Sequence, residues 1–152
     1  MNKNAIRKFA TEARRELISR VSQRALKYGI SDKEVGNPND DSVNGHLLSS
    51  TEKKPRAALI AQIKEKGYEQ VMEEVAYTWF NRLIAIRFME VNDYLPSHIR
   101  VLSSESGKLE PDLVTTPFDA ELPFTAEEEA QIFQLKQDNK LDEVFRILFL
   151  KQ

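Results

Sequence analysis

Apolar residues recur at helical spacing along most of this chain. In residues 3–28 they return every three or four positions, which predicts an amphipathic helix with one apolar stripe. We expect Asn2 or Asn4 to cap this helix and Gly29 to end it in the left-handed conformation. The stripe consists of Ile6, Phe9, Ala10, Ala13, Leu17, Val21, Ala25 and Tyr28.

A polar, turn-rich segment follows at residues 30–51, and we interpret it as an exposed loop. Residues 51–66 predict a second, shorter helix, with Thr51 as its cap and Pro55 in its first turn, where proline is tolerated.

The longest helical pattern runs from about residue 68 to residue 91 and is apolar over more than one face. A helix of that kind is usually central and buried. We therefore assign Trp79, Phe80 and Phe88 to a core rather than to a base-stacking platform, whose aromatics must be exposed. Arg87 and Glu90 lie three apart, which favours an internal ion pair between them.

Prolines divide residues 97–124 into short extended pieces, with a strand expected at residues 99–102. Thr125 and Glu128 form a capping-box pattern that opens another helix, residues 138–139 break it, and a last helix begins near Leu141. The predicted fold is mainly α, an irregular helical bundle around the long central helix, in a single domain at residues 1–152.

Composition narrows the classes of function. The absence of cysteine excludes disulfides, thiolate metal sites and cysteine nucleophiles. The N-terminus is amphipathic rather than signal-like, and no apolar run approaches the roughly 18 residues needed to span a bilayer. We expect a cytoplasmic protein with no membrane partner.

Charge is distributed unevenly. Residues 1–30 contain eight basic and two acidic side chains, a net charge of +6, which leaves −8 for the other 122 residues because the total is −2. Such an arm can contact nucleic acid, and it can equally be the solvated flank of a helix. The candidate nucleic-acid-binding residues are Lys3, Arg7, Lys8, Arg14 and Arg15.

No motif indicates chemistry in the chain itself. The five glycines are scattered, so no phosphate-cradling loop is formed, and His46 and His98 lack nearby ligand-type partners. Glu127, Glu128 and Glu129 are best explained by the helix dipole. We therefore predict no catalytic, cofactor-binding or metal-binding residue.

Three segments carry a resemblance to a known family. They are AYTWFNRLIAIRFMEVNDYLPSHIRVLSS at residues 76–104, NKNAIRKFATEARRELISRVSQRALKYGI at residues 2–30 and FQLKQDNKLDEVFRILFLKQ at residues 133–152. The chain resembles the N-terminal part of adenine-specific DNA methyltransferases of the BREX phage-defence type, the PglX proteins, which are related to large restriction–modification enzymes.

The resemblance implies a longer parent enzyme that uses S-adenosylmethionine to methylate adenine in duplex DNA. Its Asn-Pro-Pro-aromatic motif is missing here, since Asn37-Pro38 is followed by Asn39-Asp40. We therefore expect a noncatalytic fragment whose partners are its own downstream methyltransferase domain, duplex DNA or other defence-system subunits.

Two hypotheses stay open for this module. One is contact with the DNA backbone through the basic helix. The other, which we favour, is packing and docking, including self-association through Phe145, Phe149 and Leu150 of the last helix.

Overall fold

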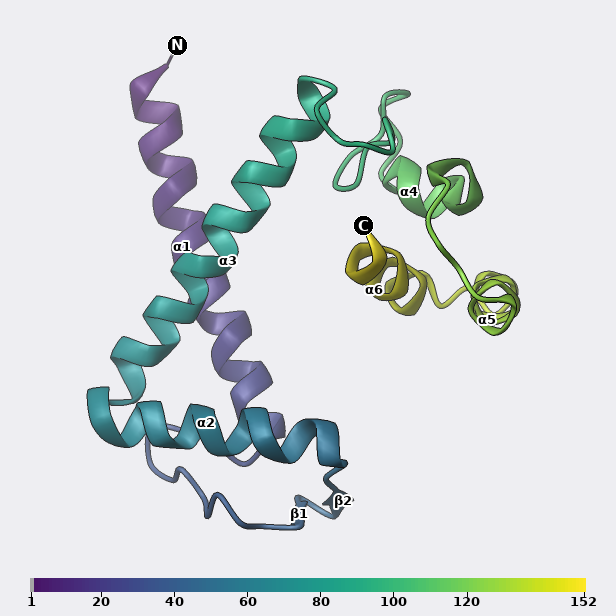
Figure 1. Ribbon diagram of the computed structural model, residues 1–152. Helices are drawn as coiled ribbons and strands as arrows, with labels where there is room; N and C mark the ends of the chain where they lie inside the picture. Colours follow the sequence, from purple (N-terminus) through teal and green to yellow (C-terminus); the bar gives the residue numbers. More distant parts are fainter. Residues whose placement is uncertain (1) are drawn as a thin grey trace. The chain divides into compact units, whose positions relative to one another are not determined.

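The computed structural model describes residues 2–152 and contains two compact units, one ending at residue 82 and the other beginning at residue 83 (Figure 1). The predicted mainly α fold is confirmed, since the described residues contain only one short two-stranded sheet. The elements are α1 (Lys3–Lys27), β1 (Ser42–Val43), β2 (His46–Leu47), α2 (Ser50–Lys66), α3 (Tyr68–Val91), α4 (Asp112–Thr115), the 3-10 helix η1 (Pro117–Ala120), α5 (Ala126–Gln137) and α6 (Leu141–Lys151).

Local signals fix the ends of α1 as predicted. The side chain of Asn2 accepts hydrogen bonds from the backbone N–H groups of Asn4 and Ala5, each at 3.1 Å. These bonds satisfy donors that the first turn of a helix leaves open. Gly29 follows the helix with φ of 70°, a conformation that costs glycine little.

The start of α2 differs slightly from the prediction. Ser49, not Thr51, is the N-cap, and its backbone N–H donates to the Glu52 carboxylate at 3.0 Å. Because the helix begins at Ser50, Pro55 lies in its second turn, where the missing N–H removes one helical hydrogen bond.

The core of the first unit gathers where the end of α1, the middle of α2 and the beginning of α3 meet. Ile30, Ile60 and Met72 are almost completely buried there. The first turns of α1 lie outside this core, and every residue from 2 to 9 is exposed. The unit is therefore packed at one end of α1 and open at the other.

The segment between α1 and α2 is a loop in which most of residues 30–51 are exposed, with a few buried apolar positions that the sequence did not indicate. It forms a small antiparallel hairpin in which Val43 pairs with His46. Ile30, Val43 and Leu48 are buried, and Ile30 belongs to the core of the first unit. Turn-forming residues on both sides concealed these isolated apolar positions.

One buried cation organises the same loop. The Arg56 side chain, only 2% exposed, donates to the backbone oxygens of Tyr28 (2.9 Å) and Asn37 (2.6 Å) and to the Asp40 carboxylate (3.2 Å). Gly36 lies directly beside it, and a Cβ added there would come within 2.6 Å of the guanidinium. Arg56 thus joins α2 to two separate points of the loop and to the end of α1.

The bounds of α3 are as predicted, but the assignment of its aromatics to a core is wrong. Trp79 is 38% exposed and Phe88 59% exposed, while Phe80 is half-buried. Burial instead concentrates at Val71, Met72 and Ala76 near the start and at Glu90 near the end. The apolar character of the helix therefore exceeds what either core uses.

The second unit contains the last turns of α3, then α4, η1, α5 and α6. Its core is formed mainly by Leu113, Ile132, Val144 and Leu148, each 0% exposed. The predicted capping box at Thr125 is confirmed, since Glu128 accepts from its backbone N–H at 2.9 Å.

No strand forms at residues 99–102, contrary to the prediction. The carbonyl of Arg100 accepts from the N–H of Leu113 at 3.0 Å, and that of Ser103 accepts from the N–H of Asp112 at the same distance. The segment is a loop held on the start of α4. Alternating apolar residues had imitated a strand for which no partner strand exists among residues 2–152.

Candidate functional site

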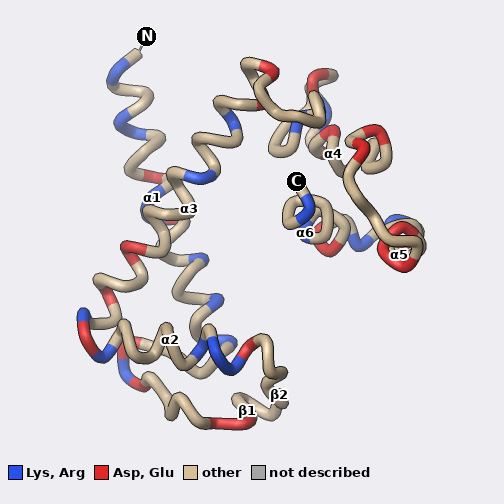
Figure 2. The backbone as a smooth tube through the Cα atoms, viewed as in Figure 1, with Lys and Arg blue, Asp and Glu red and all other residues tan. Residues whose placement is uncertain are grey.

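The five predicted nucleic-acid-binding residues all lie on the exposed N-terminal half of α1 (Figure 2). Arg14 is engaged within the first unit, because its guanidinium lies 2.9 Å from the Glu73 carboxylate of α3. Lys8 makes a long ion pair with Glu12 at 3.9 Å. Of the five residues, Arg14 and Lys8 therefore have acidic partners within the chain.

The structure brings Arg7, Lys8 and Arg15 around one shallow depression on α1, with Glu12 among them. It does not bring Lys3 or Arg14 to that depression. The described residues provide no ion pair for Lys3, Arg7 or Arg15, and the first turn of α1 contains no acidic residue. These three cations are available to an external anion.

An apolar groove of about 490 Å³ runs between α1 and α3 in the first unit. Small side chains, Ala10 and Ala76, leave the space, and Tyr77 and Phe80 form one wall. The Arg14–Glu73 ion pair lies on its rim. The sequence does not indicate this groove, because it predicts Phe80 in a core and the groove depends on the approach of α1 to α3.

A second apolar surface lies within the other unit, along the last turns of α3. Ile84, Phe88 and Val91 follow one another at spacings of four and three, so they share one face of the helix. Their exposed fractions are 46%, 59% and 53%. Tyr94, 63% exposed, packs edge-on against Phe88 with ring centroids 6.0 Å apart. Exposed large apolar residues at such density often mark an interaction site.

The face of α6 expected to mediate self-association is only partly open. Leu150 is 74% exposed, but Phe145 and Phe149 pack against the core of the second unit, with their rings 5.4 Å apart. Burial of both rings reduces what this helix offers to a partner.

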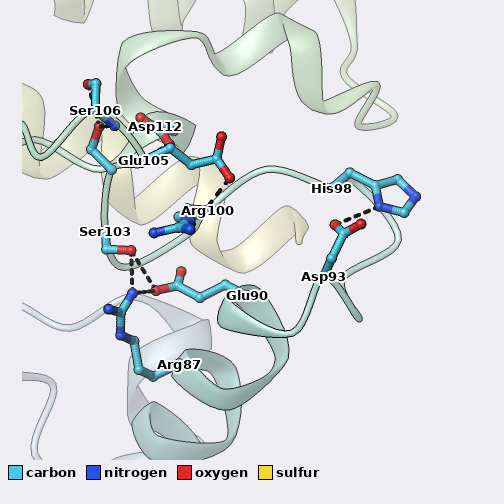
Figure 3. Close-up of polar contacts among 10 residues, drawn as sticks. Arg87, Glu90, Asp93, His98, Arg100, Ser103, Glu105, Ser106 and Asp112 are labelled. Carbon is cyan, nitrogen blue, oxygen red and sulfur yellow. Dashed lines mark hydrogen bonds and ion pairs between the residues drawn. The ribbon is translucent and has the colours of Figure 1, made fainter.

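The predicted ion pair of Arg87 and Glu90 is confirmed and belongs to a larger network (Figure 3). The fully buried Glu90 carboxylate accepts from Arg87 at 2.6 Å, from the Leu102 N–H at 2.7 Å and from the Ser103 hydroxyl at 2.9 Å. Burial alone would raise the pKa of Glu90, but these hydrogen bonds outweigh it and lower the pKa below its ordinary value. An ionised carboxylate therefore ties the loop to α3.

A second carboxylate holds the other side of the same loop (Figure 3). Hydrogen bonds, first from the Ser104 hydroxyl and then from the Glu105 N–H at 2.9 Å, lower the pKa of Asp112. Both lowered pKa values are explained by neighbouring hydrogen-bond donors, those of the loop and, for Glu90, also Arg87 of α3. The arrangement stabilises structure and holds no group poised for proton transfer.

The histidines do not form a metal site. His46 lies 3.6 Å from the Glu52 carboxylate, and His98 lies 2.8 Å from that of Asp93. Among residues 2–152 no group of three or more His, Cys, Asp or Glu side chains is arranged to hold a metal ion. In the same part of the chain, no helix combines the length and apolarity that a bilayer crossing requires.

Comparison with known proteins shows which proteins the sequence is similar to. No family model matches it. It is 37% identical over a 174-residue alignment to the adenine-specific methyltransferase PglX of Lacticaseibacillus casei (strain Zhang). It is 31% identical over 164 residues to the adenine-specific methyltransferase BrxX of Escherichia coli O9:H4 (strain HS). Both alignments cover the whole chain. The chain thus matches one segment of the BREX-type adenine-specific methyltransferases PglX and BrxX.

The chain spans only 14% of the PglX protein and 13% of the BrxX protein. At the two glycines with close neighbours, an added Cβ would meet the chain's own side chains: Val43 at 2.7 Å for Gly29 and Arg56 at 2.6 Å for Gly36.

Proposed function

We propose that this chain is the noncatalytic N-terminal helical module of an S-adenosylmethionine-dependent adenine-specific DNA methyltransferase of a phage-defence or restriction–modification system. It packs on the methyltransferase domain, assists DNA or subunit binding, and acts in the cytoplasm. The cofactor and the adenine target belong to the remainder of such an enzyme. The identity with PglX and BrxX and the small share of those proteins that the chain spans support this assignment.

One observation carries the packing role: the apolar surface of Ile84, Phe88, Val91 and Tyr94 in the second unit. Each of these side chains is about half exposed or more, and Phe88 and Tyr94 contact each other rather than the core. Covering such residues removes apolar area from water, at about 25 cal/mol for each Å² buried. In a larger enzyme, a neighbouring domain would provide the surface that covers these side chains.

The cations of α1 support a secondary role in DNA binding. Arg7, Lys8 and Arg15 surround one depression, and the guanidinium groups of Arg7 and Arg15 have no acidic partner among the described residues. Contacts of this kind bind phosphates without reading the base sequence. They would hold the duplex beside the methyltransferase domain.

A binding experiment tests the packing role directly. The probe is the L. casei PglX polypeptide without the segment that aligns with this chain. We expect the 152-residue chain to bind it, and Phe88→Ala to weaken binding at least about tenfold, as loss of a central aromatic commonly does. Leu109→Ala is the matched control, since Leu109 is fully exposed and outside this surface. No binding by the unaltered chain would contradict the packing role.

Two further measurements address catalysis and DNA. We expect no transfer of labelled methyl groups from S-adenosylmethionine to adenine-containing duplex DNA by residues 1–152, and observed transfer would refute a noncatalytic module. DNA binding should fall steeply with salt and weaken when Arg7 and Arg15 become alanine.

The alternative is a stand-alone protein–protein docking module without DNA contact. The Arg14–Glu73 ion pair favours it, because it shows that at least one cation of α1 has a structural use. Absence of any DNA binding at low salt, together with intact binding to the PglX probe, would decide for the alternative.

A further inference from the structure

The groove between α1 and α3 has the shape of a receptor for one additional helix. Its floor and wall are apolar at Ala10, Ala76, Tyr77 and Phe80, and its volume is about 490 Å³. Tyr77 is 68% exposed although it lies against this space. Ile6, four residues before Ala10 and 48% exposed, continues the apolar face of α1 beyond the groove. A partner could therefore cover a continuous apolar surface on two helices.

The edge of α1 that leads into this groove at Ala10 and Arg14 carries uncompensated positive charge. Glu73 is neutralised by Arg14 at 2.9 Å, and Glu74 by Lys66 at 2.8 Å. Lys3 and Arg7, which share the edge of α1 with Arg14, have no acidic partner among residues 2–152. An occupant with carboxylates facing this edge would gain favourable ion pairs, whereas a basic one would be repelled.

The backbone of the occupant must be helical. The backbone groups of α1 and α3 are satisfied within each helix, so they offer no donors or acceptors to an extended peptide. A strand placed here would bury unpaired N–H and C=O groups, which costs free energy. A helix satisfies its own backbone and presents apolar side chains every three or four residues, the pattern that fits a groove between two helices.

We infer that the α1–α3 groove binds an amphipathic helix with an apolar stripe and acidic flanks, supplied by the methyltransferase polypeptide outside these 152 residues. That source rests on the proposed function. The inference adds a second contact, separate in sequence from the surface of Ile84, Phe88, Val91 and Tyr94. It also gives Lys3 and Arg7 a second kind of partner, a protein carboxylate, besides the DNA phosphate proposed above.

The same L. casei PglX polypeptide, without its aligned segment, is the probe. We expect Tyr77→Ala and Arg7→Glu each to weaken its binding to the 152-residue chain at least about tenfold, as central anchors of an interface commonly do. Arg15→Glu makes the same charge change on another side of α1 and should alter binding less than about threefold. Circular dichroism of each variant checks that helix content is unchanged, which the exposure of these three side chains leads us to expect.

The outcomes separate this inference from the proposed function. Loss of binding with Phe88→Ala but not with Tyr77→Ala or Arg7→Glu would overturn the groove and leave the packing role standing. No binding by the unaltered chain would contradict both the groove inference and the packing role. Equal losses with Arg7→Glu and Arg15→Glu would show only a general attraction for cations, and would also overturn the groove. A dimer of the isolated chain that Tyr77→Ala dissolves would assign the groove to a second copy instead.

Discussion

Replacing Glu90 should destabilise the second unit more than replacing any other single charged residue there. Its side chain is 0% exposed and accepts three hydrogen bonds, from Arg87, the Leu102 N–H and the Ser103 hydroxyl. Glu90→Ala removes the two acceptor oxygens and with them all three hydrogen bonds. It leaves the Leu102 N–H without its partner beneath the loop.

The magnitude follows from these contacts. Removing one partner from a buried ion pair costs about 3–5 kcal/mol. Arg87 is 48% exposed, so its freed guanidinium can turn to water and the cost is smaller. A stranded backbone N–H adds about 1–3 kcal/mol. We expect a loss of about 2–4 kcal/mol for Glu90→Ala, and about 1–2 kcal/mol for Glu90→Gln, which keeps one acceptor.

Urea unfolding followed by circular dichroism measures the loss, and hydrogen exchange at the Leu102 amide shows where it arises. Glu105→Ala is the control, because Glu105 is 76% exposed and lies 3.5 Å from Arg100; it should change stability by less than about 0.5 kcal/mol. A loss below about 1 kcal/mol for Glu90→Ala, or unchanged exchange at Leu102, would refute the role given to this network.

The pH dependence provides an independent check. The folded pKa of Glu90 lies below its unfolded value, so its stabilisation is fully present above about pH 4.3 and is lost as pH falls through the folded pKa. Glu90→Gln should therefore flatten the fall in stability below about pH 4.3. Equal slopes for both proteins would contradict the lowered pKa.

Three further predictions concern local structure. Arg56→Met should cost about 2–4 kcal/mol and speed hydrogen exchange in residues 31–41, because two carbonyls lose their donor, while the Asp40 carboxylate is 40% exposed and can turn to water; protection like that of the parent chain would contradict this. Thr125→Ala should cost about 1 kcal/mol in urea unfolding through loss of the cap of α5, and no change would argue against the capping box. Gly29→Ala should lower the melting temperature more than Gly45→Ala, since both have positive φ but only the first Cβ meets Val43, at 2.7 Å; equal shifts would refute the steric reason.

Local sequence signals decided the elements of this fold. The bounds of α3, the cap at Asn2, the left-handed Gly29 and the capping box at Thr125 all depend on residues within a few positions of one another. Such signals can be recognised in the sequence because they do not depend on tertiary contacts. The single domain at residues 1–152, the DNA contact of α1 and the partners stay predictions, because they concern surfaces that no local pattern defines.

The errors have one physical source. Periodicity shows that Trp79 and Phe88 can be buried, but burial depends on a neighbouring surface that the sequence does not place. The same limitation hid Ile30, Val43 and Leu48 among turn-forming residues and produced a strand at residues 99–102 that finds no partner within the described residues.

By itself, the sequence determined where the five longer helices lie and which methyltransferases the chain resembles, because these depend on local spacing and residue identity. Only the tertiary structure decided which apolar faces are covered and which stay open. It joined Arg14 to Glu73 and Arg56 to Asp40, pairs 59 and 16 residues apart in the chain. The groove beside Tyr77 exists because two helices distant in sequence approach each other over small side chains, a relation that neither helix encodes alone.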